Sequence, residues 1–376
     1  MRIGIDIRVL GRNRRGFEAH VKGLLEHLHE VAPDDEFLLY LDHPTSDSIL
    51  DRPNYDVRLL RSGFRPLIWT NYHLPEAVRR DGVDLFHFPS SNIWFRPGSR
   101  AVVTLHDISF MFSNEVAFMP FMTRAYVGQL LGRMRKSAEL IVTDSEASRD
   151  DICRFLKIRS SRVRVVHLGV SERFRKLPDE QVQEMLQRMG VGNRPYLLSV
   201  GSLDARKNLK ILISAYDLLR DETDFNPMLV LVGEAQRTVG SVGVNPQRAI
   251  ARSRHKEDIL LLGYVADEDV VALYNGALLL VVPSLYEAFG LPLVEAMACG
   301  TPVVASNNAA APEVAGEAAL YFDPHKPEQI AHCMEKVLAD SPLSDRMRSV
   351  GLERARRFSW SECARGTVGV YRECLR

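Results

Sequence analysis

The chain has 376 residues, of which 46% are hydrophobic, and it carries 48 Lys and Arg against 48 Asp and Glu. This length exceeds one ordinary hydrophobic core, so two domains are expected. A formal net charge of zero provides no bulk attraction to nucleic acids, and we expect no nucleic-acid partner. The five cysteines include no C-x-x-C pair, which indicates a reducing compartment and argues against a structural zinc site.

The apolar runs of the sequence are short. None reaches the ~18 residues that a membrane-spanning helix needs, and residues 1–10 enter a strand pattern without the long apolar region of a signal peptide. We therefore expect a cytoplasmic protein, and peripheral association with the inner membrane face stays an open alternative. The sequence does not indicate an oligomeric state.

In the first half of the chain, short apolar strands alternate with amphipathic helices. Strands are expected at residues 2–9, 37–41, 57–60, 84–90, 101–107, 140–145 and 163–170. Helices are expected at residues 17–31, 67–80 and 121–136, and a further helix carries residues 151–157. Either Ser145 or Ser148 can cap the last of these helices. Strands separated by helices predict βαβ units and a parallel sheet with helices on both faces.

A polar, charged stretch at residues 171–194 is the expected domain boundary. After it, strands are expected at residues 195–201, 228–234, 259–265, 278–284, 301–306 and 319–324, with helices at residues 208–219, 247–254, 267–275, 292–299 and 328–338. A last helix at residues 358–375 is expected to pack across the domain junction. The predicted division is therefore an N-terminal domain at 1–175, a C-terminal domain at 190–356 and a helix at 357–376 that returns to the first domain.

Two glutamates flank a turn in the stretch LLLVVPSLYEAFGLPLVEAMACG. Glu287 follows the predicted strand and Glu295 lies in the helix, at the sheet edge where open α/β proteins bind ligands. Gly290 permits close approach of a ligand, and the N–H groups near Gly290 and Leu291 form an anion site suited to a diphosphate. The alternative is that Glu295 is a first-turn acid favoured by the helix dipole and Glu287 a solvated loop charge.

A second anion site is indicated by SVGSLDARKNL, where Arg206 and Lys207 stand between a strand and a helix. Arginine can bridge two phosphate oxygens, and lysine supplies a compact charge. The alternative is an exposed pair on the surface. Because both loops follow strands of the same half, phosphate binding is the favoured interpretation.

Evidence for other sites is weaker. His106 ends a strand of the first half, where an imidazole can position a substrate hydroxyl, transfer a proton or make a structural hydrogen bond. The loop GRNRRG at residues 11–16 has only two glycines and fails the G-x-G-x-x-G pattern. The acids at 267–269 suit a helix start without any metal. We expect neither a metal site nor a cofactor.

Several segments together resemble glycosyltransferase family 4, a family of retaining enzymes. They are EAFGLPLVE, GSLDARKN, GYV after a strand, TPVVAS and APEVAGEAALYFDP, and the resemblance spans nearly the whole chain. It implies the GT-B fold, in which two Rossmann-like domains face each other across a cleft and a C-terminal helix crosses back. It also implies that the donor is a nucleotide-diphosphate sugar and that transfer needs no metal ion. The implied acceptor is a saccharide or lipid-linked saccharide in cell-surface polysaccharide synthesis.

The resemblance assigns roles by position. Arg206 and Lys207 match residues that contact the diphosphate, and Glu295 matches the acid that binds the ribose hydroxyls. Glu287 matches the acid beside the donor sugar. One departure is Ala288, where the family more often has glycine, and we expect it to be tolerated.

Further positions are implied in the same way. The backbone at Phe289, Gly290 and Leu291 is expected to contact the sugar and the phosphates, and the backbone at Val265 is expected to contact the base. The side chain of His106 is expected to contact the sugar, and Gly16 is expected to approach the diphosphate. His106 and Glu287 are the expected catalytic residues. Contacts at the loop that ends in Gly16, and with them the acceptor, are the least defined part of the resemblance.

The donor is open within this family resemblance. The segments GIDIRVL and LHD look most like mannosyltransferases, which makes GDP-mannose the first choice, with UDP-glucose and dTDP-rhamnose as alternatives. A nucleotide-sugar epimerase of the same two-domain architecture is a second possibility for the activity. An inactive binding subunit would be expected to lose Glu287, His106 or the Arg206 and Lys207 pair, all of which are present.

Overall fold

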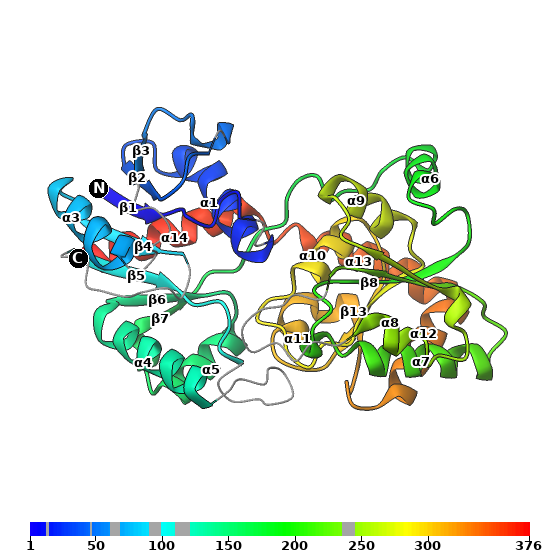
Figure 1. Cartoon of the computed structure of the whole chain (residues 1–376). Coiled ribbons are helices and arrows are strands. Elements are labelled where there is room, and N and C mark those ends of the chain that lie inside the picture. Colours follow the sequence, from blue (N-terminus) through cyan, green and yellow to red (C-terminus); the bar gives the residue numbers. More distant parts are fainter. Residues whose placement is uncertain (13–14, 46, 61–67, 90–98, 110–120, 235–244) are drawn as a thin grey trace. The chain divides into compact units, whose positions relative to one another are not determined.

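The computed structural model describes residues 1–12, 15–45, 47–60, 68–89, 99–109, 121–234 and 245–376 (Figure 1). The chain forms two compact units. The described residues of unit 1 fall within Met1–Met111, Phe121–Gly169 and Ser359–Arg376, and those of unit 2 fall within Val170–Phe358. Each unit is built on its own parallel sheet.

Unit 1 contains a seven-stranded parallel sheet with the order β3-β2-β1-β4-β5-β6-β7. Its strands are β1 (Arg2–Asp6), β2 (Glu36–Leu41), β3 (Tyr55–Leu59), β4 (Leu85–Phe88), β5 (Arg100–Thr104), β6 (Leu140–Thr143) and β7 (Val163–Val165). The central apolar runs are buried on both faces, as in β4, where all four residues are buried, whereas the edge strand β3 is partly exposed. The strand order reverses between β1 and β4, so a topological switch point lies there.

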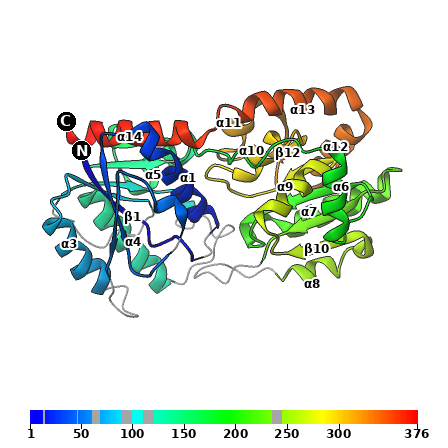
Figure 2. The same ribbon diagram turned by 90° about the horizontal axis from the view of Figure 1, so that it is seen from above.

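The helices of unit 1 cover this sheet. They are α1 (Arg15–Val31), α3 (Leu74–Arg80), α4 (Phe121–Ser137), α5 (Glu146–Leu156) and α14 (Trp360–Leu375), with shorter helical turns η1 (Ser48–Leu50), η2 (Trp69–His73) and η4 (Ser160–Arg162). The last helix of the chain, α14, lies against the first, α1 (Figures 1 and 2). A Cβ on Gly23 of α1 would come within 2.1 Å of the Trp360 ring, so only glycine fits there. The predicted return of the C-terminal helix to the first domain is thereby confirmed.

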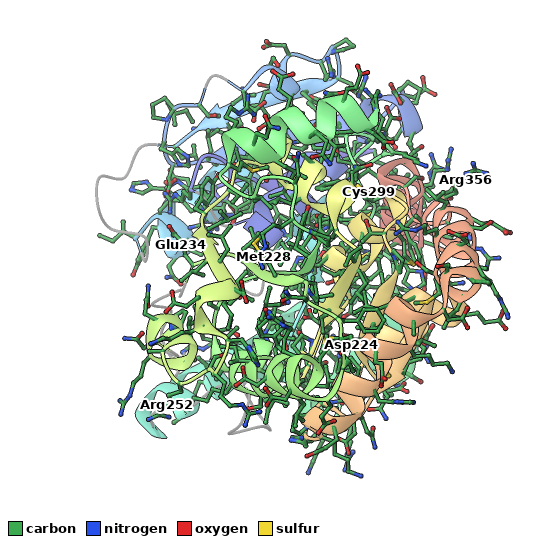
Figure 3. The ribbon with its side chains drawn as sticks, turned by 90° about the vertical axis from the view of Figure 1, so that its right-hand side faces the viewer. Asp224, Met228, Glu234, Arg252, Cys299 and Arg356 are labelled. Atoms are coloured by element: carbon green, nitrogen blue, oxygen red, sulfur yellow. The ribbon has the colours of Figure 1, made fainter. Side chains whose placement is uncertain are left out.

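Unit 2 contains a six-stranded parallel sheet with the order β10-β9-β8-β11-β12-β13. Its strands are β8 (Tyr196–Val200), β9 (Met228–Val232), β10 (Ile259–Gly263), β11 (Leu279–Val282), β12 (Val303–Ser306) and β13 (Ala319–Phe322). In Figure 3, Met228 marks the first residue of β9 and Glu234 the segment that follows its end. The order reverses between β8 and β11, so the switch point of this sheet lies between the loops that follow these two strands.

The helices of unit 2 enclose its core. They are α6 (Asp179–Arg188), α7 (Leu209–Glu222), α8 (Pro246–Ile250), α9 (Asp267–Gly276), α10 (Leu291–Ala298), α11 (Ala311–Ala315), α12 (Pro327–Ala339) and α13 (Ser341–Ala355), with turns η5 (Ala205–Lys207), η6 (Lys256–Asp258) and η7 (Gly316–Ala318). Leu212 and Tyr216 of α7 join Val281, Ile330 and Met334 in one buried cluster. The chain thus forms two consecutive α/β units, each with a parallel sheet, and the predicted fold class is confirmed.

Some boundaries differ from the prediction. For α5, Ser145 is the one of the two predicted caps that the structure uses: the helix begins at Glu146, and the Ser145 Oγ accepts the Ser148 N–H at 3.1 Å. The helix at 341–355 was not predicted, since its apolar residues form no clear stripe. The predicted starts or ends at residues 67 and 90 lie outside the described residues. Among the described helices, none is both long and apolar enough to cross a membrane.

Candidate functional site

The switch point of unit 2 brings two polar loops together. Arg206 and Lys207 lie in η5, in the loop after β8, and Glu287 lies in the loop after the neighbouring strand β11. The loops are joined through their backbones, since the Leu285 N–H donates to the Arg206 carbonyl at 2.8 Å. The charged residues found in separate stretches of sequence therefore meet in one cluster.

The carboxylate of Glu287 is the centre of this cluster and is only 5% exposed. Its Oε1 accepts hydrogen bonds from Lys207 Nζ and Ser284 Oγ, both at 2.5 Å, and its Oε2 accepts one from Arg206 Nη1 at 3.4 Å. Burial alone would raise the pKa of Glu287. The charges of Lys207 and Arg206, with the hydrogen bonds from Lys207 and Ser284, outweigh burial and lower this pKa below its usual value. Glu287 is therefore an ionised carboxylate that accepts three hydrogen bonds, and not a solvated loop charge.

Backbone features around the cluster explain how it is held. Gly201 has a φ of +149°, and a Cβ there would lie 2.8 Å from Cε of Lys207, so glycine leaves the path along which the lysine side chain runs. The carbonyl of Glu234, labelled in Figure 3, accepts the Leu203 N–H at 3.0 Å and ties the same loop to the end of β9. Asn208 ends η5 in the left-handed region and donates to the Pro283 carbonyl at 3.2 Å. These contacts fix the two cations before any ligand arrives.

The start of α10 completes this edge of the sheet. Gly290 is its N-cap with a φ of +92°, and Leu291 is its first residue. Phe289 is 2% exposed and stacks edge-on against Phe358, with ring centres 5.5 Å apart. The backbone from Phe289 to Leu291 therefore turns into the helix over a packed base, with the first N–H groups of α10 at the carboxyl edge of the sheet.

Glu295 belongs to a different contact. It lies within α10, and its Oε2 accepts a hydrogen bond from the Tyr274 hydroxyl at 2.8 Å. The two glutamates therefore have different partners: Glu287 pairs with two cations, and Glu295 accepts a hydrogen bond from a tyrosine hydroxyl. Tyr274 is on α9 and is fully buried, so it fixes the orientation of Glu295.

Val265 lies just after β10, two strands away from β8 in the same sheet. It is 8% exposed, while the preceding Tyr264 is 51% exposed. Gly263, at the end of β10, accepts the Gly233 N–H at 2.7 Å, which joins this loop to the end of β9. Val265 is therefore at the same carboxyl edge as the charged cluster.

In unit 1, His106 follows β5 and contacts a residue that the sequence did not single out. Its Nδ1 is 2.7 Å from Oδ2 of Asp144, and its Nε2 is 3.3 Å from the Pro89 carbonyl. His20 on α1 packs edge-on against the same ring, with centres 4.7 Å apart. Burial lowers the pKa of His106, but the charge and hydrogen bond of Asp144 and the Pro89 carbonyl outweigh it, so that this pKa is raised.

Gly16 lies in the first turn of α1, and a Cβ there would have no heavy atom within 4 Å among the described residues. In the preceding loop, Arg12 pairs with Asp42 at 2.6 Å, whereas Asn13 and Arg14 lie outside the described residues. Space beside Gly16 is compatible with a ligand contact.

Three supporting residues were missed from the sequence. Ser284 precedes Glu287 by three residues in the same loop and could have been found from that proximity. Asp144 directly follows β6, the strand beside β5, and could have been found only with the strand order known. Tyr274 gave no signal, because a buried tyrosine in an apolar helix resembles any core residue.

The acids at 267–269, for which no metal role was expected, include two that pair with arginines. Asp267 accepts from Arg173 at 3.2 Å, and Asp269 accepts from Arg188 at 2.6 Å. Within the part of the chain that the structure describes, no three His, Cys, Asp or Glu side chains gather in a way that could hold a metal ion.

Comparison with known families and proteins accounts for both units. Residues 14–174 match Glycosyltransferase Family 4, and residues 182–354 match Glycosyl transferases group 1. O-antigen chain mannosyltransferase B of Escherichia coli is 34% identical over 314 residues, which cover 82% of this chain and 81% of that protein. The serotype-specific mannosyltransferase WbdA of Escherichia coli is 31% identical over 229 residues, which are 60% of this chain and only 28% of WbdA.

Solved structures agree on the fold. HepE of Anabaena, solved in complex with UDP-glucose, superimposes with a TM-score of 0.76 at 19% identity, covering 99% of this chain and 100% of that one. The two parallel-sheet units thus have the GT-B architecture. From the family matches and the 34% identity over most of both proteins, the chain belongs to the family 4 glycosyltransferases.

Proposed function

We propose that this glycosyltransferase is a retaining mannosyltransferase that moves mannose from GDP-mannose to a saccharide or lipid-linked saccharide of a cell-surface polysaccharide. The observation that carries the proposal is the pair of cations, Arg206 and Lys207, fixed on the buried Glu287 at the switch point of unit 2. Mannose is supported by the names of the two relatives in Escherichia coli. The nucleotide-sugar class is supported by HepE, which was solved with UDP-glucose.

Departure of the nucleoside diphosphate is the step that the cluster serves. When the bond between the anomeric carbon and the phosphate oxygen breaks, its electrons remain on the diphosphate, where negative charge grows. Arg206 and Lys207 carry two positive charges that can contact this diphosphate directly, while Glu287 and Asp204, which lies 3.9 Å from Arg206, hold the two cations in place. Cations and the first N–H groups of α10 at Gly290 and Leu291 stabilise that charge without reorganisation.

Glu287 is proposed to orient hydroxyls of the donor sugar and not to attack its anomeric carbon. Both carboxylate oxygens already accept hydrogen bonds, from Lys207 and Ser284 on one and Arg206 on the other. A carboxylate so occupied is a weak nucleophile. Retention is therefore proposed to occur by front-face attack, in which the acceptor oxygen bonds to the anomeric carbon and its proton passes to the departing phosphate.

The remaining positions are proposed to bind the donor. Glu295 binds the ribose hydroxyls in the orientation set by Tyr274, backbone at Val265 meets the base, and backbone at Phe289 meets the sugar. His106 contacts the transferred sugar, and Gly16 approaches the diphosphate. These roles rest on the family resemblance, and the carboxyl-edge positions of the residues support them.

The experiment that tests this proposal is a thermal-shift panel of GDP, UDP and dTDP with their sugars, followed by product analysis with a lipid-linked saccharide acceptor. We expect GDP and GDP-mannose to raise the melting temperature most, and an α-mannosylated product to form from GDP-α-mannose. Stabilisation by UDP-glucose or dTDP-rhamnose alone would reassign the donor. Sugar interconversion without an acceptor would show an epimerase instead.

Peripheral association with an anionic membrane is also proposed, on the basis of a basic surface in unit 1. A shallow hollow of about 600 Å³ is lined by Arg135, Lys136, Lys157, Ile158, Arg159 and Arg162. Arg135 and Arg162 also donate to carbonyls at the ends of α5 and α4. The nearby Phe155 is 39% exposed, and an exposed ring beside cations suits a lipid headgroup region.

The remaining cations of this surface allow a test that spares the fold. Lys136, Lys157 and Arg159 are exposed, and their side chains make no hydrogen bond or ion pair with another described residue. Each contributes about 1 kcal/mol of attraction to an anionic bilayer. Reversing all three to Glu is expected to abolish cosedimentation with phosphatidylglycerol vesicles at low salt.

A matched control reverses three exposed cations of unit 2, Lys210, Lys256 and Arg346. Unchanged vesicle binding in this control, with loss in the first variant, assigns binding to the basic surface. Equal loss in both would mean that only overall charge matters, and equal binding of both to phosphatidylcholine vesicles would contradict an electrostatic surface.

A further inference from the structure

His106 and Asp144 stand opposite each other because of strand register. Thr104 of β5 pairs with Val142 of β6, and each of the two residues lies two positions beyond that pair. Parallel strands that leave the sheet in register bring their next loop residues together. The result is a contact of 2.7 Å between His106 Nδ1 and Asp144 Oδ2, with side chains 12% and 3% exposed.

The surroundings of Asp144 determine the charge of this pair. Within the described part of the chain, its other oxygen, Oδ1, is buried and has no hydrogen-bond partner, so His106 is the group that the carboxylate relies on. A buried carboxylate without a positive partner is strongly disfavoured. A positively charged His106 is therefore the partner that this buried carboxylate favours.

Both nitrogens of the His106 ring face acceptors. Nδ1 faces the Asp144 carboxylate, and Nε2 faces the Pro89 carbonyl at 3.3 Å, a group that can only accept. A neutral ring can donate to only one of these two acceptors, although the Pro89 carbonyl also takes part in a hydrogen bond with His20. A ring with a proton on each nitrogen satisfies both.

The other titratable groups around the ring fit the same assignment. His20 on α1 and His87 on β4 are buried, and burial together with the charge of His106 lowers the pKa of each. Asp107, next to His106 in the chain, adds a second nearby negative charge. Phe17 is an uncharged ring 5.2 Å away, and on α14 the buried Cys363 thiol lies near Asp144, where burial and the charge of Asp144 raise the pKa of the thiol. One positive charge among three imidazoles is the arrangement that the site supports.

We infer that Asp144 is a positioning residue that holds His106 as a doubly protonated imidazolium, whose Nε2–H is the donor presented to the substrate. This rests on the proposed contact of His106 with the transferred sugar. The bond to Pro89 is long, so a sugar or phosphate oxygen can replace the carbonyl as acceptor. A ring protonated on Nε2 cannot remove a proton from the acceptor hydroxyl, which leaves that proton to the departing phosphate.

The experiment is a titration of the histidine side chains by ¹⁵N-NMR in wild type, in Asp144→Asn and in Asp107→Asn, with kinetics on the same proteins. In wild type we expect His106 to be protonated on both nitrogens at neutral pH. In Asp144→Asn its pKa falls below the ordinary histidine value, because burial remains and the carboxylate is gone. Asp107→Asn is the matched control and is expected to shift this pKa far less.

In kinetics, Asp144→Asn is expected to lower kcat on the order of 10²-fold while the KM for donor changes little. Wild-type activity is expected to fall as pH rises through the raised pKa of His106. In Asp144→Asn the same loss on rising pH is expected to begin at a lower pH, because the pKa of His106 is lower there. A neutral His106 in wild type at neutral pH overturns the inference, and this measurement needs no variant to fold. If His106 is charged but no nucleotide sugar binds by calorimetry, the proposed function fails while the inference about the pair stands.

Discussion

Replacing Glu287 with Gln tests whether this carboxylate holds the cations or takes part in the bond-breaking step. The change keeps the shape and removes the charge that Lys207 and Arg206 share. Breaking a buried ion pair from one side costs about 3–5 kcal/mol. The two cations are 13% and 23% exposed, so water compensates them in part, and we expect about 3 kcal/mol, the lower end of that range. At about 2–4 °C per kcal/mol, the melting temperature should fall by roughly 6–12 °C.

The effect on ligands has the opposite sign. Without the negative charge of Glu287, the local net charge rises, so a nucleoside diphosphate should bind as tightly as to wild type or more tightly by calorimetry. Turnover should nevertheless fall, because the donor sugar has lost the carboxylate that orients its hydroxyls. Equal losses in turnover and affinity would refute this assignment and show that Glu287 and Glu295 have exchanged roles.

Acid pH provides an independent check of the same residue. The pKa of Glu287 in the folded protein is lowered, so its stabilising contribution is full above the ordinary glutamate pKa and disappears as pH falls through the folded value. The difference in melting temperature between wild type and Glu287→Gln should therefore be largest near neutral pH and shrink in acid. A difference that is constant with pH would mean that the ionised carboxylate is not what stabilises the loop.

Three further changes test the remaining positions. Arg206→Ala with Lys207→Ala should weaken nucleoside diphosphate binding more than tenfold in calorimetry, and unchanged affinity would remove the cations from the diphosphate site. Tyr274→Phe removes the hydrogen bond to Glu295, worth about 1 kcal/mol, and should raise the KM for donor about fivefold with kcat retained. Gly16→Ala meets no described atom, so its melting temperature should match wild type. If the diphosphate approaches Gly16, the activity of Gly16→Ala should fall, and full activity of this variant would exclude that contact.

Local elements were largely readable from the sequence. Each sheet is made of the runs that were expected to be strands, and the central ones were clearest, because strands buried on both faces leave a continuous apolar pattern. Helix α13 was missed for the converse reason: it buries only a few residues, Met347 and Gly351 among them, and has no continuous apolar face. Ends of elements were less accurate, since they depend on caps such as Ser145, which competes with Ser148 in the sequence.

The contacts of the site depend on strand order, which the sequence does not specify. Loops after β8 and β11 are far apart in the chain, and they meet because these strands are neighbours at the reversal of the sheet order. The pairing of Lys207 with Glu287 could therefore not be predicted, although both residues were identified individually. The same reason applies to His106 and Asp144, which adjoin through the pairing of β5 with β6.

Burying Glu287 beside the cations has a consequence for binding. A carboxylate on Lys207 and Arg206 offsets part of their charge and so weakens their attraction for a diphosphate. It also fixes both side chains in place, and rotamer-rich side chains otherwise cost about 0.5–1.5 kcal/mol each when a ligand immobilises them. Because Ser284 and the left-handed turn at Asn208 hold the same loops, the cations are oriented before the donor arrives. Such preorganised charge favours the transition state over the ground state, since it is already aligned when negative charge develops on the leaving group.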